Sequence, residues 1–394
     1  MAEALAGVRV LDLSRLVAGG MLGMVLADFG AEVVKVEQPG HGDPLRAWTV
    51  QGESLWWRVY GRNKRAVTLN LQAPEGQEIF RRLIPRFDVL IEAFVPGTME
   101  RWGLDWETLR QWHPGLILAR ISGWGQTGPD AARPGFGTLV EAASGFAAMN
   151  GEPDGAPIVP AYPLADMTTA LYGYGAIMTA LYHRDVHNGA GQMIDLSLFE
   201  SIFSTLGPLA AEYARHGVVR ERQGSRSRNA GPRGVYKTAE GSWIAVSAST
   251  PTMAVRFMRA YGLSEMLDDP RFATNEARVR HAVELDAAVS EAIGGRTAAE
   301  NRAIIAGHQL TAQPVQTIAE IANDPHWQAR DLLVDAADDT GDVRMHHVVP
   351  HLSETPGAIH WPGRPVGADN HALYGDELGI PDDALARLAE RGVI

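Results

Sequence analysis

Strand patterns and helix patterns alternate over the first 123 residues, and this alternation constrains the fold more than any other feature of the chain. Short apolar strand patterns occupy residues 7–13, 31–36, 66–71, 88–94 and 116–123, and helical patterns separate them. Strands joined through helices pair in parallel, because the crossover returns the chain to the same edge of the sheet. We therefore expect an α/β fold with a wound, mainly parallel sheet.

The pattern changes beyond residue 215, which indicates a domain boundary. A second apolar helix is expected at 194–213, and the Arg- and Gly-rich stretch 216–233 then lacks apolar periodicity. Residues 234–248 alternate around a Glu-Gly turn, as in a β-hairpin, and 251–306 are typical of several helices. These segments predict a smaller α+β module after the boundary.

Composition narrows the possible chemistry. The formal charge of −12 argues against general binding to nucleic acid or anionic membranes. The chain contains no cysteine, so covalent catalysis would need a carboxylate, a serine or a lysine. The N-terminal stretch lacks the pattern of a signal peptide, and no apolar run has the length of a membrane span. We expect a cytoplasmic protein.

Asp166 is the carboxylate of greatest interest, because it stands at the mouth of a long apolar helix pattern. Asp before Met-Thr-Thr-Ala-Leu is a common helix opening, so its residue type favours an N-cap. It could equally be a nucleophile held away from water. The two roles are compatible, since a helix dipole keeps the acid ionised while apolar walls remove its water.

Glycines after the first strand weakly suggest a dinucleotide site. Gly19, Gly20 and Gly23 do not have the G-x-G-x-x-G spacing that this site needs for its tight turn and its pyrophosphate contact. A nicotinamide-dependent oxidoreductase is therefore an alternative from another class.

Clustered cations offer a second candidate site. Arg58, Arg62, Lys64 and Arg65 surround a turn before a buried strand, where they could cradle a phosphate or could be ordinary surface charge. The arginines of the stretch 220–233 have the same two explanations, with a solvated linker as the simpler one.

Three histidines in the tail could suggest a metal site. His347 and His351 would point to one side of an alternating strand and His346 to the other, and no neighbouring acid completes a ligand set. We expect solvated histidines and no metal.

At this point an ordered set of motifs resembles the class III CoA-transferases, the formyl-CoA transferase and CaiB/BaiF family. The resemblance spans nearly the whole chain. It lies in GVRVLDLSRLVAGG, LADFGAEVVKVEQPGHGDPLR, RNKRAVTLNLQAPEGQ, VLIEAFVPGTMERWGLDW, ISGWGQTGP, PLADMTTALYGYGAIMTALYHR and LTAQPVQTIAEIANDPHWQARDL.

The resemblance implies the remaining architecture. It implies a large wound, Rossmann-like domain formed by residues 1–215 and by 332–394, which return to it after a linker. Residues 216–233 would form the other linker, and 234–331 the smaller α+β domain. Members of this family form interlocked homodimers, so a homodimer is expected.

The resemblance also implies an activity, the transfer of CoA from an acyl-CoA donor to a small, possibly dicarboxylic, free acid. Asp166 would form a mixed anhydride with the acyl group and then an aspartyl-CoA thioester. Coenzyme A enters as a substrate, and no permanently bound cofactor is expected. Arg15, or an arginine between Arg226 and Arg233, could hold a distal carboxylate by a fork contact.

The family's CoA contacts fall on three groups of residues in this chain. The pantetheine and thioester end would meet Arg15, Leu16, Val17 and Ala18; the nucleotide would meet Gln38, Leu69, Asn70, Leu71, Gln72, Ala93, Phe94, Val95 and Arg101; the acyl region would meet Phe136 and Gly137.

Two further alternatives bind CoA without transferring it. An α-methylacyl-CoA racemase pairs the aspartate with a histidine in a Gly-His-Asp run, but here the run is Gly135-Phe136-Gly137, which lacks that base. A non-catalytic acyl-CoA binding protein would bind CoA and form no acyl-enzyme.

Overall fold

The computed structural model describes residues 3–338 and 341–394, which form two compact units. Unit 1 contains residues 3–146, 159–208 and 329–394. Unit 2 contains residues 147–158 and 209–328, so a short segment from the first half of the chain belongs with the later module. The domain limits expected from the sequence, with a linker at 216–233 and a return at 332, remain a prediction.

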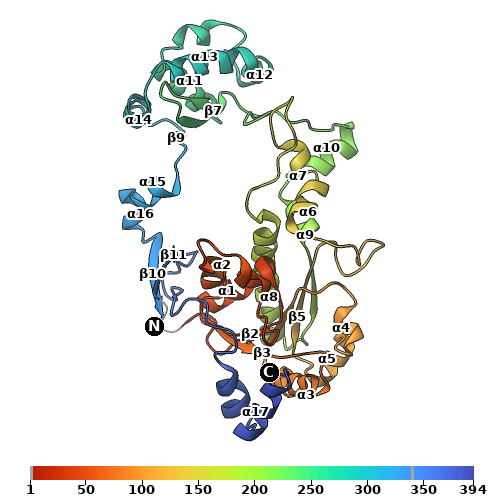
Figure 1. The fold of residues 1–394 in the computed structure, drawn as a ribbon. Helices are drawn as coiled ribbons and strands as arrows, with labels where there is room; N and C mark the ends of the chain where they lie inside the picture. The colour runs from red at the N-terminus through yellow and green to blue at the C-terminus, as the bar shows by residue number, and fades with distance from the viewer. Residues whose placement is uncertain (1–2, 339–340) are drawn as a thin grey trace. The chain divides into compact units, whose positions relative to one another are not determined.

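Unit 1 is built on one six-stranded parallel sheet, visible edge-on in Figure 1. Its order, β3-β2-β1-β4-β5-β6, reverses direction between β1 and β4, as in sheets that bind dinucleotides. The expected wound α/β fold is confirmed. In sheet order the strands are β3 Lys64–Thr68, β2 Glu32–Glu37, β1 Arg9–Asp12, β4 Val89–Glu92, β5 Ile117–Ser122 and β6 Met193–Ser197.

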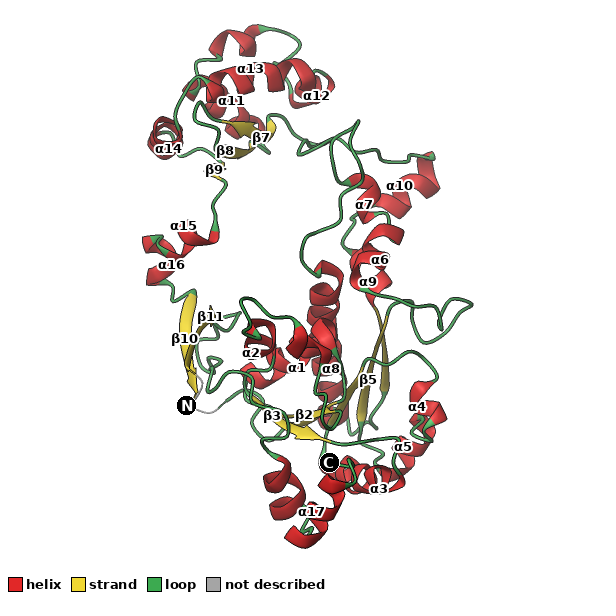
Figure 2. Cartoon of the chain, viewed as in Figure 1, coloured by secondary structure: helices red, strands yellow, loops and turns green. Residues whose placement is uncertain are grey.

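Helices cover both faces of this sheet (Figures 1 and 2). The helices of unit 1 are α1 Leu16–Asp28, α2 Leu55–Tyr60, α3 Pro74–Leu83, α4 Thr98–Arg101, α5 Trp106–Trp112, α6 Gly137–Ala143, α8 Leu164–Val186, α9 Leu198–Ser204 and α17 Asp382–Glu390, with the shorter turns η1 Pro44–Ala47, η2 Ile84–Arg86 and η4 His371–Glu377. A two-stranded ribbon, β10 Leu333–Asp338 and β11 Gly341–His346, completes it.

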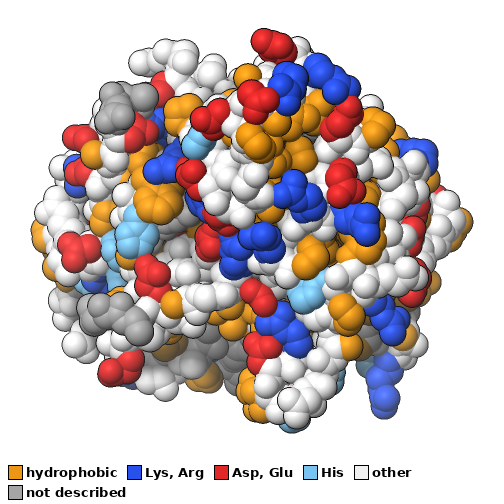
Figure 3. Space-filling model, turned by 90° about the horizontal axis from the view of Figure 1, so that it is seen from below, with side chains coloured by type: hydrophobic (Ala, Val, Ile, Leu, Met, Phe, Trp, Pro, Cys, Tyr) orange, Lys and Arg blue, Asp and Glu red, His pale blue; other side chains and the backbone are white. Residues whose placement is uncertain are grey.

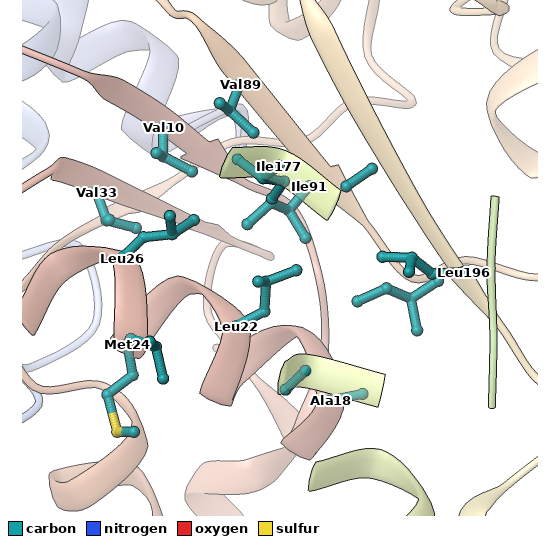
Figure 4. Close-up of a cluster of buried hydrophobic side chains, with 14 of the residues drawn as sticks. Val10, Ala18, Leu22, Met24, Leu26, Val33, Val89, Ile91, Ile177 and Leu196 are labelled. Carbon is teal, nitrogen blue, oxygen red and sulfur yellow. The ribbon is translucent and has the colours of Figure 1, made fainter. Parts of the chain in front are cut away.

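Alternate residues of the strands supply two separate cores, because successive side chains point to opposite faces. Val10 pairs with Val33 and Val89, and these three pack against α1 and α8 (Figure 4). Helix α1 is apolar all round and almost wholly buried, as expected for a helix between a sheet and another helix. The intervening strand residues, Leu11 among them, pack against α3, α5, η4 and α17 on the opposite face, and the C-terminal Ile394 lies in that core.

The apolar helix expected at 194–213 is wrong. Residues Met193–Ser197 form the edge strand β6, and two helices follow, α9 and α10 (Leu209–His216). A short apolar run does not distinguish a strand from a helix by periodicity, and pairing with β5 decides it here. The tail strand also differs, since β11 ends at His346, before most of the strand-like run.

Unit 2 packs a three-stranded antiparallel sheet, β7-β8-β9, against a group of helices (Figure 2). The expected hairpin is present, and the Thr238 N–H donates to the Ser242 carbonyl at 2.8 Å across its turn. The expected helices of 251–306 are also confirmed. The elements of unit 2 beside α10 are β7 Arg233–Lys237, β8 Trp243–Ser247, α11 Pro251–Ala260, η3 Ser264–Asp268, α12 Asn275–Arg280, α13 Ala282–Gly294, α14 Ala298–Gly307, β9 Ala312–Pro314 and α15 Ile318–Ala322, while α7 Phe146–Met149 and α16 Pro325–Ala329 cross unit limits.

Positive and negative side chains are interspersed over the face shown in Figure 3. Several of the ion pairs at the surface join residues one turn apart, such as Arg387 and Asp383 on α17. Pairs of this kind contribute little to stability, so the buried charges described below are more informative.

Candidate active site

A cavity of about 850 Å³ opens at the carboxyl edge of the parallel sheet in unit 1. The residues that follow β1, β2, β3, β4 and β5 all contribute to its lining. Ligands of wound sheets bind at this edge, beside the point where strand order reverses, because the strand ends diverge there. The cavity is thus where the topology alone would place a site.

The turn between β1 and α1 forms one wall of this cavity. Leu16 has a positive φ of 61°, a conformation that is costly for a residue with a branched side chain. The carboxylate of Asp43 accepts the Leu16 N–H at 3.1 Å and the Leu45 N–H at 2.8 Å. This acceptor holds the turn in place, so the strain is maintained by side-chain contacts from the loop after β2.

Four buried charges support the turn from below. Asp12 pairs with Lys64 at 2.9 Å and lies 3.7 Å from Lys35, which pairs with Asp43 at 2.9 Å. Burial alone would raise the pKa of Asp12, but the two lysines and the Ser14 hydroxyl lower it to about 2. Charges paired in this way are locked in one arrangement, because separating them leaves a buried ion without a partner.

Two glycines of α1 serve this packing. A Cβ at Gly19 would lie 2.1 Å from the Ser14 side chain, and one at Gly23 would lie 2.8 Å from both Asp12 Oδ2 and Lys64 Nζ. The glycines therefore let the helix approach the buried charges, which explains them without a dinucleotide.

Asp166 lies in the first turn of α8 and is not its N-cap, so that expectation is wrong. The helix begins at Leu164, Pro163 occupies the cap position, and Asp166 is the third helical residue. The Ala165 N–H is accepted instead by Glu141, a buried residue of α6, at 3.0 Å. Since Glu141 provides the cap, the Asp166 carboxylate remains available to the cavity that it lines.

The surroundings of Asp166 disfavour its charged form. Burial is the main cause that raises its pKa to about 6, and the nearby Glu141 raises it further. Its own N–H and the N–H of Ala18 donate to the carboxylate and act in the opposite direction. Among the ion pairs of residues 3–338 and 341–394, none includes Asp166. The result is a carboxylate that is ionised at neutral pH but poorly compensated, a state suited to nucleophilic attack.

Gly137 leaves room for this carboxylate. A Cβ at position 137 would lie 2.2 Å from Asp166 Oδ2, so any larger residue would displace one of the two side chains. The neighbouring Phe136 is 61% exposed and lines the cavity. The Gly-Phe-Gly run thus supplies an apolar rim and an open approach to Asp166.

Thirteen of the sixteen residues expected from the sequence line this cavity of unit 1. The three that do not are Val17, Arg101 and Gly137: Val17 is buried in the core, Arg101 is exposed on α4 and donates to Thr98 at 2.8 Å, and Gly137 lies under Asp166. The thirteen are Arg15, Leu16, Ala18, Gln38, Leu69, Asn70, Leu71, Gln72, Ala93, Phe94, Val95, Phe136 and Asp166.

Other lining residues were not expected. Arg46 and Arg133 add cations, His41 adds an imidazole, and Ser122 and Gly123 follow β5 directly. The position of Ser122 and Gly123 at a strand end could have been anticipated from the sheet order. Arg133 comes from a long loop, where it lies over the Trp124 ring at 4.6 Å, and no sequence pattern indicated it.

The phosphate cradle considered at Arg58, Arg62, Lys64 and Arg65 is wrong. Arg62 is fully buried and pairs with Asp28 at 2.6 Å, and Lys64 pairs with Asp12. Arg58 and Arg65 bind Asp338 and Glu377. All four cations are neutralised by carboxylates, so none is available to a phosphate.

Two sequence expectations concern metals and membranes. Within residues 3–338 and 341–394, no group of His, Asp and Glu has an arrangement that could hold a metal ion. No described helix combines the length and the apolar character that crossing a membrane requires.

Comparison with known proteins identifies the family. The model of CoA-transferase family III matches residues 5–370. The succinyl-CoA–D-citramalate CoA-transferase of Chloroflexus aurantiacus is 40% identical and aligns over 98% of this chain and 97% of its own length. Human succinyl-CoA:glutarate CoA-transferase is 30% identical over 99% of this chain and 90% of its own length.

A solved structure agrees with these sequence matches. A CaiB/BaiF family protein from Brucella suis superposes with a TM-score of 0.84 at 30% identity, and the match covers 95% of this chain and all of that one. The motifs, the sheet order and the matched length lead to one assignment. The chain belongs to CoA-transferase family III.

Proposed function

We propose that this enzyme transfers CoA from a dicarboxylic acyl-CoA, such as succinyl-CoA, to a second small dicarboxylic acid, and that Asp166 carries the acyl group and then CoA. The observation that supports this most is the position of Asp166 in the cavity, where it forms no ion pair with any residue in 3–338 or 341–394 and its pKa is raised. The relatives named above use succinyl-CoA, which favours the same donor class here.

The proposed reaction proceeds in four exchanges. Asp166 attacks the donor thioester carbonyl and the C–S bond breaks, which gives a mixed anhydride and CoA thiolate. The thiolate attacks the Asp166 carbonyl carbon, releases the donor acid and leaves an aspartyl-CoA thioester. The acceptor carboxylate displaces CoA to form a new anhydride, and the thiolate then attacks the acceptor's acyl carbon, which frees the product and restores the aspartate.

No water takes part in these steps, and the site is suited to that requirement. Hydrolysis of an anhydride or thioester would lose the acyl energy without transfer, so the reacting atoms must be kept dry. Asp166 is partly buried, which removes part of the water around its carboxylate. The Ala18 N–H, which donates to the free carboxylate, would also donate to the oxyanion that develops when Asp166 is attacked.

The racemase alternative lacks a second base at the expected place. Phe136 stands in the Gly135-Phe136-Gly137 run and presents an apolar ring to the cavity. A single carboxylate can exchange acyl groups, whereas racemisation needs proton transfer on both faces of the α-carbon. The geometry around Asp166 therefore favours transfer.

The homodimer implied by the resemblance is part of this proposal. Helix α8 exposes an apolar stripe in unit 1, formed by Leu171, Tyr182 and Val186, each more than half exposed, with the open Gly175 between them. Exposed apolar surface of this kind commonly meets a second chain. Light scattering of the purified protein would measure the mass in solution, and a monomer would contradict the homodimer.

The acyl-enzyme can be tested directly. Incubation with succinyl-CoA, trapping with hydroxylamine and mass spectrometry should place a label on the peptide that contains Asp166. Asp166→Asn should lose at least about a thousandfold of its transfer activity and all of the label, with CoA affinity kept. Asp383→Asn, which changes an exposed aspartate of α17, is the matched control. Full activity of Asp166→Asn would contradict the proposal.

A further inference from the structure

Unit 2 contains its own cavity, of about 880 Å³, which the function proposed above does not use. The segment 220–235 supplies most of its lining, and the rest comes from β8, from β9 and the residues before it, and from Met149 and Asn150. Four arginines line it: Arg220, Arg226, Arg228 and Arg233. Such a concentration of cations is unusual in a chain with a formal charge of −12.

Two of these arginines are already neutralised. Arg220 donates to both carboxylate oxygens of Glu212, and its Nε lies 2.7 Å from one of them. Arg226 pairs with Asp286 at 2.5 Å, and Asp286 also accepts the Tyr236 hydroxyl at 2.7 Å. These pairs tie the segment to α10 and α13, so Arg220 and Arg226 have structural roles.

The other two arginines are different. Arg228 and Arg233 are exposed, and neither forms an ion pair with any residue in 3–338 or 341–394. Glu212 interacts with Arg228 only at longer range, and Glu221 also lines the cavity. Two guanidinium groups therefore remain to bind an anion that enters the cavity.

The backbone that carries these two residues is held firmly. Asn275 donates to the Asn229 carbonyl at 2.8 Å, and Arg278 donates to the Gly231 carbonyl at 2.9 Å. Arg278 is only 1% exposed, and in the described part of the chain its charge meets carbonyls and no carboxylate. Burial of an uncompensated cation is costly, which indicates that its contact with the segment is needed.

We propose that this cavity binds the carboxylate of a small dicarboxylic acid through Arg228 and Arg233. A guanidinium group matches the two oxygens of a carboxylate in a fork contact, and two of them can hold one anion in a fixed orientation. The proposal rests on the proposed function, because the bound acid is the acceptor of the transfer or the acid that the donor releases. A phosphate would satisfy the same fork, so the experiment includes it.

Calorimetric titration of the full protein with succinate, butyrate and inorganic phosphate tests the proposal. Succinate should bind the wild type, and Arg228→Gln and Arg233→Gln should each weaken it by about tenfold or more, as expected for loss of a charged hydrogen bond. Arg233→Lys keeps the positive charge but loses the fork contact, so its affinity for succinate should lie between those of the wild type and Arg233→Gln. Arg215→Gln, an exposed arginine of α10 outside the cavity, is the matched control.

The outcomes separate this inference from the proposed function. Unchanged succinate affinity in both glutamine variants would overturn the cavity assignment, and so would equal affinity for phosphate and succinate. Labelling of Asp166 by saturating succinyl-CoA is measured in the same variants and should persist. If the label appears but succinate binding does not depend on the arginines, only the inference fails; if succinate binding depends on them but no label appears, only the proposed function fails.

Discussion

Two aspartates of unit 1, the buried Asp12 and the partly buried Asp166, flank the same turn and have opposite electrostatics. Asp12 lies below the turn, where Lys35 and Lys64 lower its pKa to about 2 despite complete burial. Asp166 lies on the cavity side, without a cation and with Glu141 nearby, and its pKa rises to about 6. Burial is the largest single influence in both cases, so the neighbouring charges decide the direction.

This difference separates a structural carboxylate from a reactive one. A paired carboxylate stabilises the fold in its ionised form, and its negative charge is compensated by its partners. An unpaired one is a better nucleophile because little of its charge is shared. The two residues are coupled through the turn, since the Asp12 network holds the backbone from which the Ala18 N–H reaches Asp166.

The largest effect is expected when the Asp12 network is broken. Asp12→Asn leaves Lys64 and Lys35 buried with one fewer counter-charge, which should lower the free energy of unfolding by about 3 to 5 kcal/mol. Because the folded pKa of Asp12 lies near 2 and an unfolded aspartate ionises at about pH 4, the wild type has this stabilisation in full at about pH 6. Urea denaturation at that pH measures the loss. A loss below about 1 kcal/mol would mean that the pairing contributes little.

Crowding Asp166 should affect catalysis more than stability. Gly137→Ala places a methyl group where Asp166 Oδ2 now lies, at 2.2 Å, and should reduce kcat/KM by about a hundredfold, since displacing a reactive group by about 1 Å has effects of this size. Gly307→Ala at the end of α14 is the control, because nothing lies within 4 Å of its added Cβ. Equal activity of the two variants would show that Asp166 tolerates displacement.

The sequence allowed much of unit 1 to be predicted and less of the site's detail. The alternation of strands and helices is local information, and it predicted the parallel sheet. The strand-end residues Leu69–Gln72 and Ala93–Val95 came from the family resemblance, and both groups line the cavity of unit 1 described above. The partners of Asp166 could not be predicted in this way. Glu141 lies 24 residues before Ala165, and nothing in the spacing indicates that it would take over the cap.

The role of the basic cluster at 58–65 could not be predicted from the sequence either. Four cations around a turn suggested an anion site, but their carboxylate partners come from distant parts of the chain, such as Asp28 for Arg62 and Glu377 for Arg65. Whether a charge is free or neutralised depends on tertiary contacts, and a sequence pattern reports only the charge. The same test distinguishes Arg226 from Arg228 in unit 2.

A smaller effect is expected on stability, and its dependence on pH should distinguish Asp166 from Asp12. The folded protein keeps a proton on Asp166 up to about pH 6, whereas an unfolded aspartate loses it near pH 4. The charged form therefore destabilises the fold above pH 6, and the cost disappears as the pH falls to 4. Asp166→Asn should be more stable than the wild type by about 1 to 2 kcal/mol at pH 8, discounted for partial exposure, and equally stable near pH 4. Thermal unfolding at both pH values checks this, and a difference independent of pH would contradict it.

The smallest effect is expected for Glu141, whose negative charge can be removed without removing the hydrogen bond by which it caps α8. Glu141→Gln keeps an oxygen that accepts the Ala165 N–H but removes the negative charge that raises the pKa of Asp166. The wild-type kcat/KM should fall as the pH drops below about 6, because attack needs the ionised carboxylate. In Glu141→Gln this fall should move to lower pH by less than about one unit, since burial remains the main cause of the shift.

Glu141→Ala is the companion variant, because it removes the charge and the cap together. It should show the same movement of the pH profile and, in addition, a loss of about 1 kcal/mol of stability from the unpaired Ala165 N–H. A profile that moves in neither variant would mean that Glu141 acts only as a cap and that burial, without the lysines that compensate Asp12, is enough to raise the pKa of Asp166.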